Sequence, residues 1–130
     1  MPPKWALGYQ QCRYSYYPDK EVLTLAHTFR DKDMPADVIY LDIHHMEDYK
    51  VFTFDGEKFS DPKGLIARLK EKGFRVVVIL DPGIKTQAGY IPYDEGIEQG
   101  LFVNYPDAVY EAKFVEPNEI NNYLNSTFHR

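Results

Sequence analysis

The sequence has 130 residues, 44% of them hydrophobic and 15% aromatic, and its 15 basic and 20 acidic residues give a net charge of −5 at pH 7. This length and apolar content predict one folded domain, or part of one, and exclude a disordered tail. The acidic balance, without any lysine or arginine run, argues against nucleic acid as a partner, because phosphate backbones are bound by clustered cations. No apolar stretch approaches the roughly 18 residues that cross a bilayer, and the first residues lack a signal peptide's apolar region. We therefore expect a soluble protein without a membrane partner, cytoplasmic by default, although a secreted longer protein stays open.

A strand, a helix and a second strand are predicted between residues 5 and 43. Residues 5–10 are apolar and aromatic without a helical period, which favours a strand. Asp19 can cap a helix that Pro35 ends, and the apolar stripe of this helix is Val22, Leu25, Ala26 and Phe29. Residues 38–43 are apolar up to Asp42, as in a strand buried on both faces.

A small β-extension, a second helix and a third strand are predicted next. Residues 49–54, followed by a turn at Asp55, indicate the β-extension. Asp61 can cap the second helix, and Gly73 stands where a left-handed residue ends it. Residues 75–80 are rich in β-branched side chains and form the strongest strand, which stops at Asp81. Residues 85–110 read as a long loop with a helical turn at 93–99, and a last amphipathic helix is predicted from Pro117.

Alternation of strands and helices predicts an α/β fold, because parallel strands need crossover connections. We expect about three parallel strands and two to three crossover or packing helices. Ligands of such sheets gather at the carboxyl ends of the strands. Residues 12–14, 42–45 and 81–83 all fall on this rim. The sequence therefore predicts a functional site there.

Structural roles compete with functional ones for these residues. Asp42 and Asp81 could simply cap the turns that follow their strands. A metal site at His44-His45 is disfavoured, because adjacent strand residues point to opposite faces and no third histidine lies nearby. Cys12, the single cysteine, could be a thiolate activated by its arginine neighbour but is more often a small buried residue. No glycine-rich phosphate turn is present, so a nucleotide cofactor is not expected.

Six motifs in one order and spacing resemble a known family. They are PKWALGYQ at 3–10, CRYSYYP at 12–18, DVIYLDI at 37–43, FTFD at 52–55, ILDPGI at 79–84 and YDEG at 93–96. Together they are similar to glycoside hydrolase family 31, the α-glucosidases and related enzymes, whose catalytic domain is a (β/α)₈ barrel. The likeness covers residues 2–111 and implies a partial TIM barrel made of the first three β/α units. Residues 112–130 do not match and are expected to be a helical tail.

The resemblance implies that part of a sugar site is present. Asp42 corresponds to the family's strand-two aspartate that accepts hydrogen bonds from hydroxyls of the non-reducing glucose, with Ile43 against the ring. Tyr14 stands where many members have tryptophan in the same pocket. Ile79 and Asp81 correspond to an apolar wall and a supporting acid near the nucleophile. The expected partner is a small-molecule sugar, an α-glucoside, with no metal and no cofactor.

The resemblance also implies that the catalytic pair is missing. Retaining glycosidases use two carboxylates about 5 Å apart. The family's nucleophile lies in a strand-four Trp-x-Asp-Met-Asn-Glu pattern that is not in this sequence, and Asp33-Met34 is followed by Pro35 at a helix end. We expect a fragment of a retaining α-glycosidase that is inactive alone. The alternative is a non-enzymatic truncated module that binds sugar weakly or self-associates through exposed sheet edges; an independent small enzyme using Asp42 and Asp81 is disfavoured.

Overall fold

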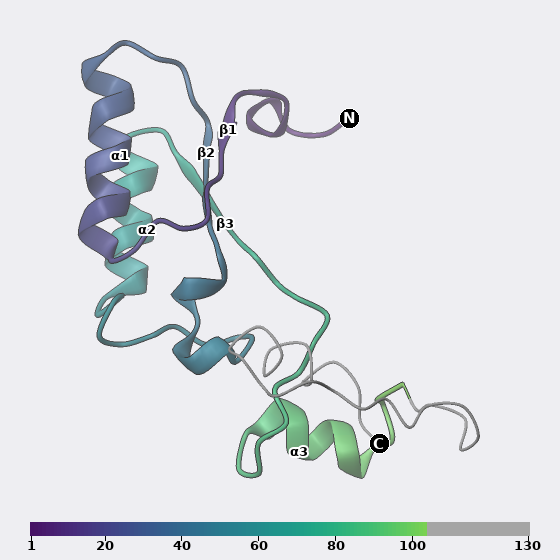
Figure 1. Cartoon of the computed structure of the whole chain (residues 1–130). Helices are drawn as coiled ribbons and strands as arrows, with labels where there is room; N and C mark the ends of the chain where they lie inside the picture. Colours follow the sequence, from purple (N-terminus) through teal and green to yellow (C-terminus); the bar gives the residue numbers. More distant parts are fainter. Residues whose placement is uncertain (104–130) are drawn as a thin grey trace. The chain divides into compact units, whose positions relative to one another are not determined.

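The computed structural model describes residues 1–103, which divide into two compact units. The first unit comprises Met1–Asp48 and Phe52–Leu80, and the second contains Tyr49–Val51 and the residues from Asp81 on. The first unit holds the helices α1 (Asp19–Asp31) and α2 (Pro62–Glu71) and the strands β1 (Gln10–Gln11), β2 (Val38–Leu41) and β3 (Arg75–Val78) (Figure 1). Short 3-10 helices lie at Lys4–Leu7 (η1), Ile43–His45 (η2) and Glu47–Tyr49 (η3). The second unit holds α3 (Ile91–Glu98).

The three strands form one parallel sheet in the order β1-β2-β3. Gln10 pairs with Val38, and Val38 pairs in turn with Arg75, so the strand order follows the chain order. The central strand β2 is bonded on both edges, which matches its continuously apolar sequence. The predicted α/β fold with three parallel strands is therefore confirmed.

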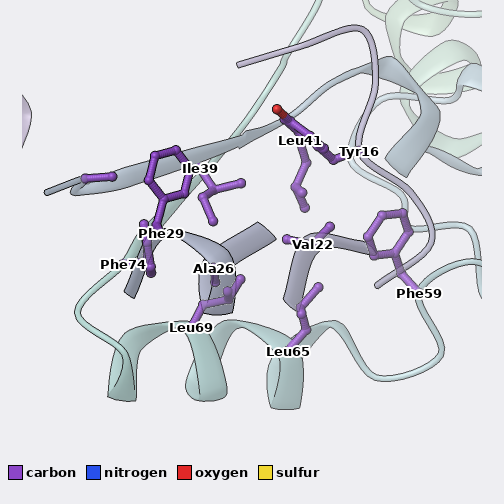
Figure 2. Packing of buried hydrophobic residues seen from close by; sticks show 11 residues of the cluster. Tyr16, Val22, Ala26, Phe29, Ile39, Leu41, Phe59, Leu65, Leu69 and Phe74 are labelled. Carbon is purple, nitrogen blue, oxygen red and sulfur yellow. The ribbon is translucent and has the colours of Figure 1, made fainter. Parts of the chain in front are cut away.

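A single apolar layer joins the sheet to α1 and α2. In Figure 2 the side chains of the two helices converge on those of β2, and aromatic rings close the two ends of the layer. Ile39 and Leu41 come from β2, Leu65 and Leu69 come from α2, and all four are fully buried. Burial of one such side chain stabilises a fold by about 1.5–3 kcal/mol. The remaining members of this core are Tyr16, Val22, Ala26, Phe29, Ala36, Phe59 and Phe74.

The ends of the two helices largely follow the sequence signals. The carboxylate of Asp61 accepts a hydrogen bond from the backbone N–H of Gly64 at 2.9 Å and so caps α2. Gly73 adopts a φ of 81° just after α2, as expected for a left-handed stop. The start of α1 differs by one residue: Pro18 is the N-cap, and Asp19 is the first helical residue.

Arg30, near the end of α1, connects three segments. Its Nε donates to the carbonyl of Lys72 at 2.8 Å, and its Nη2 donates to the carbonyl of Ala36 at 2.9 Å. The guanidinium carbon also lies 3.9 Å from the centroid of the Phe74 ring. One side chain therefore fixes the end of α1 against the end of α2 and the approach to β2.

Two predicted strand segments are wrong. Within residues 5–10, the apolar run belongs mostly to η1, and pairing with β2 is confined to Gln10–Gln11. Residues 49–54 contain no strand, so the predicted β-extension does not form. The chain turns there instead, with positive φ angles of 49° at Asp48, 57° at Tyr49 and 64° at Phe52. These left-handed residues are incompatible with an extended strand.

The second unit contains the helical turn that the sequence predicts near residues 93–99, here α3. Tyr90 precedes α3 and is buried, and its hydroxyl donates to the carbonyl of Val51 at 2.6 Å. Burial raises the pKa of the Tyr90 phenol above its usual 10.0. The predicted helix from residue 117 and the boundary at residue 111 lie outside the described residues. Among residues 1–103, no helix is both long and apolar enough to span a membrane.

Candidate functional site

Asp42 follows the central strand directly and is half-buried at its carboxyl end. Its Oδ1 accepts a hydrogen bond from the backbone N–H of Ile43 at 2.7 Å, which makes Asp42 the N-cap of η2. The capping role that the sequence left open is therefore real. Within the described part of the chain, no protein group donates to the other carboxylate oxygen. A carboxylate can accept several hydrogen bonds, so capping leaves this oxygen available for a ligand hydroxyl.

Ile79 continues β3 beside this acid. Its backbone N–H donates to the carbonyl of Leu41 at 2.9 Å, which extends the pairing of β2 with β3 by one residue. The register pairs Leu41 with Val78, so Asp42 and Ile79 are the next neighbours across the two strands. Neighbouring residues of parallel strands project from the same face. A half-buried aliphatic side chain therefore stands next to the acid, as a sugar pocket with an apolar wall would need.

An aromatic cluster stands at the same end of the sheet. The ring of His44, in η2, stacks on the ring of Tyr17 with centroids 4.9 Å apart and an interplanar angle of 12°. The ring of Tyr14 meets His44 edge-on, with centroids 4.9 Å apart and an angle of 73°. Tyr14 is 71% exposed. Because β1 leads into residues 12–18, the end of β1 supplies both tyrosines and the end of β2 supplies the histidine.

Lys58 connects this cluster to the FTFD motif. Its ammonium lies 2.9 Å from the carboxylate of Asp55 and 5.4 Å from the centroid of the Tyr17 ring. The hydrogen bond from the Lys58 ammonium lowers the pKa of the Asp55 carboxyl below 3.8. Backbone N–H groups of Glu57 and Lys58 also donate to Asp55, at 3.0 and 3.2 Å. The sequence did not indicate Lys58, Tyr17 or His44 as partners, because they come from three separate segments.

The other residues that the sequence analysis considered for chemistry are Cys12 and the His44-His45 pair. Cys12 is exposed, so its expected burial is wrong. Its neighbour Arg13 pairs with Glu21 at 2.5 Å. His45 is buried with its Nδ1 2.8 Å from the Asp42 carbonyl oxygen, so this imidazole supports the turn. Within residues 1–103, no group of three or more His, Cys, Asp and Glu side chains is arranged to hold a metal ion.

The five predicted sugar residues are divided between the two units. Tyr14, Asp42, Ile43 and Ile79 belong to the first unit, at the carboxyl ends of β1, β2 and β3, whereas Asp81 belongs to the second. Ile43 is half-buried at the start of η2. The aromatic cluster and the β2 end are joined through η2, which carries Ile43 and His44 directly after Asp42.

Comparison with known proteins identifies the family. The model of the glycosyl hydrolases family 31 TIM-barrel domain matches residues 1–129. The chain belongs to glycoside hydrolase family 31. Among curated family 31 relatives, α-glucosidase 2 of Bacillus thermoamyloliquefaciens is 57% identical over 105 residues, which cover 81% of this chain and 13% of that protein.

Solved structures of family 31 enzymes have the same fold as this chain. The glucosidase II α subunit in its Glc1Man2-bound form superposes with a TM-score of 0.77 at 38% identity, over 80% of this chain and 11% of that one. The family 31 α-glucosidase of Bacteroides thetaiotaomicron gives a TM-score of 0.69 at 44% identity, over 84% and 18% of the two chains. The chain thus spans less than a fifth of the length of these relatives and corresponds to a fragment of their TIM barrel.

Proposed function

We propose that this chain supplies the sugar-holding part of a retaining α-glycosidase of the α-glucosidase type, which acts on α-linked glucosides as a longer protein. The main observation behind this proposal is the geometry of Asp42. One of its carboxylate oxygens caps η2, and the other is available to a ligand at the carboxyl end of the central strand. The names of the relatives support an α-glucoside as the substrate class. In this proposal Tyr14, Ile43 and Ile79, which all belong to the first unit, contact the sugar ring.

We also propose that the 130-residue chain does not hydrolyse glycosides by itself. Retention requires a nucleophilic carboxylate and a second carboxylate that acts as acid and base. The family's strand-four motif with the nucleophile is missing from these 130 residues. Holding a sugar without these groups lowers no barrier, because only interactions that strengthen in the transition state accelerate the reaction.

The test uses the purified chain with maltose and with an aryl α-glucoside. We expect weak binding of maltose in a calorimetric or NMR titration and no release of the aryl group. Asp42→Asn should weaken binding without unfolding the chain, because asparagine caps helices as well as aspartate does. Asp61→Asn, at the cap of α2, is the matched control and should bind as the original chain does. Turnover by the chain alone would refute the inactivity, and unchanged binding by Asp42→Asn would refute the role of Asp42.

A second candidate function is self-association through a sheet edge. Among the described strands, β3 pairs only with β2, so its outer edge presents unpaired backbone groups. Val78, the last residue of β3, and Leu80, two residues further on, are 38% and 58% exposed. We expect the mass in sedimentation equilibrium to rise with concentration and Val78→Lys to lower it. A monomer at the highest soluble concentration would exclude this function.

A further inference from the structure

His44 is held between two tyrosines of different exposure. Tyr17, which stacks on His44, is 38% exposed, whereas Tyr14, which His44 contacts edge-on, is 71% exposed. Stacked and edge-to-face rings at such separations attract each other through their quadrupoles. Among residues 1–103, His44 provides the only ring contact of Tyr14. The orientation of Tyr14 therefore depends on His44 more than on any other ring.

Tyr17 is the anchored end of this stack. The Lys58 ammonium lies near its ring and is itself held by the carboxylate of Asp55. The backbone of Lys58 is fixed as well, because its carbonyl accepts a hydrogen bond from the N–H of Asp19 at 3.0 Å, at the start of α1. A cation near an aromatic face is attracted by the quadrupole of the ring. The stack therefore has Tyr17, held by Lys58, at one end and the exposed ring of Tyr14 at the other.

The backbone of His44 is fixed by the turn that follows β2. Asp42 caps this turn through Ile43, and the N–H of His45 donates to the Asp42 carbonyl at 3.0 Å. One of the ring nitrogens of His44, Nδ1, is buried. The imidazole therefore has a defined position relative to the candidate sugar acid, two residues away along the chain.

We propose that His44 is a positioning residue that holds the exposed Tyr14 ring ready to stack on the apolar face of a pyranose bound at Asp42. This inference rests on the proposed sugar site. An exposed tyrosine that samples several rotamers loses that freedom when a ligand orders it, which weakens binding. The contact with His44 restricts the ring before the sugar arrives. His44 acts through Tyr14 and does not itself contact the sugar.

The experiment compares variants of the whole chain. His44→Ala removes the ring contact, and His44→Phe keeps a ring that can stack on Tyr17 and meet Tyr14. We expect His44→Ala to weaken methyl α-glucoside binding in an NMR titration by about 2- to 10-fold, the factor for immobilising one free side chain on binding. His44→Phe should stay within about twofold of the original chain. His27→Ala changes an exposed histidine of α1 and is the matched control.

Two further measurements separate positioning from a general structural role. His44→Ala should add nothing to the affinity loss of Tyr14→Ala in the double variant, because both act through the same ring. Without sugar, the aromatic NMR signals of Tyr14 should move in His44→Ala toward those of a free tyrosine and return in His44→Phe. Thermal unfolding of each variant shows whether the fold is retained.

The possible results test the positioning role of His44 separately from the existence of the sugar site. If the original chain binds the sugar and His44→Ala binds equally well, the inference is overturned and the site stands. If His44→Phe loses as much affinity as His44→Ala, the imidazole contacts the sugar directly, which also overturns it. If the original chain binds no sugar, the proposed function fails, and the Tyr14 signals alone then decide whether His44 positions the ring.

Discussion

Replacement of Arg30 by alanine tests whether one side chain stabilises the joint between α1, α2 and β2. The substitution removes two hydrogen bonds to carbonyl oxygens, at 2.8 and 2.9 Å, and the contact with the Phe74 ring at 3.9 Å. A hydrogen bond contributes about 1 kcal/mol net, and a partly exposed cation–π contact contributes about 0.5–1 kcal/mol. We therefore expect Arg30→Ala to lower the free energy of unfolding by about 2–4 kcal/mol. Arg30→Lys keeps the charge but lacks the planar fork, so about half of the loss should remain.

The assay is urea unfolding monitored by far-ultraviolet circular dichroism. The slope of the unfolding free energy against urea concentration has to be equal for all variants. Arg68→Ala is the matched control, because Arg68 is exposed and its Nε donates at 3.2 Å to Gly64 of its own helix. Such a surface change should stay within about 0.5 kcal/mol. Equal losses for Arg30→Ala and Arg68→Ala would refute the reasoning, since they would mean that the contacts between segments contribute nothing beyond a surface side chain.

Three further predictions concern packing and protonation. Gly8→Ala should destabilise the fold by about 1 kcal/mol at most, measured by urea unfolding, because its Cβ would overlap the carboxylate of Asp37, which has to rotate away. Asp55 has a lowered pKa in the folded state, so its contribution to stability is complete above pH 3.8 and is lost as the pH falls through the folded value. Lys58→Met should weaken this pH dependence in unfolding curves, because the hydrogen bond from the ammonium is its largest cause, while the backbone donors remain. Tyr90 has a raised pKa, so its contribution is complete below pH 10.0 and is lost as the pH rises further. Tyr90→Phe should cost about 1–3 kcal/mol, because a carbonyl loses its donor, and should remove a tyrosinate absorbance step above pH 10.0.

Matched variants control these predictions. Gly56→Ala is the partner of Gly8→Ala, because a Cβ at Gly56 meets nothing within 4 Å; equal effects would contradict the steric reason. Lys63→Met removes an exposed lysine of α2 and should leave the acid limb of the stability curve unchanged. If Lys58→Met also leaves it unchanged, the ion pair is not its cause. For Tyr90, unaltered alkaline absorbance in Tyr90→Phe would contradict the burial argument.

The helices and the two long strands were predictable because their signals are local. Asp61 and Gly73 mark the two ends of α2 through side-chain capping and a left-handed φ, and both depend only on residues within one turn. The parallel sheet followed from the alternation of strands and helices. By contrast, the apolar run at residues 5–10 predicts a strand wrongly, because periodicity alone does not distinguish so short a run from a helical turn.

The β-extension failed for a different reason. Residues 49–54 have side chains that suit a pleated surface, but the backbone at Tyr49 and Phe52 is left-handed. Strand propensity reflects packing on a sheet, and no neighbouring strand pairs with this segment among the described residues. The turn after β2 therefore overrides the local preference.

The candidate site was predictable only in part. Asp42 was found because an acid at the end of a buried strand stands out in the sequence. The stack of Lys58, Tyr17, His44 and Tyr14 was not found, because it brings together residues up to 44 positions apart, and no local pattern encodes their contact. An acidic residue at the end of a strand can be recognised in a sequence. The side chains that contact it or its neighbours can be identified only from the folded structure.

The order of the strands bears on how such a polypeptide is synthesised. Each strand pairs with the one that leaves the ribosome immediately before or after it. Gln10 pairs with Val38, and Val38 pairs with Arg75, so the two pairings close loops of 28 (38 − 10) and 37 (75 − 38) residues. Each pairing in this sheet therefore needs only residues up to the end of β3, so these three strands can assemble as soon as β3 has been synthesised, whatever part of the polypeptide is made later.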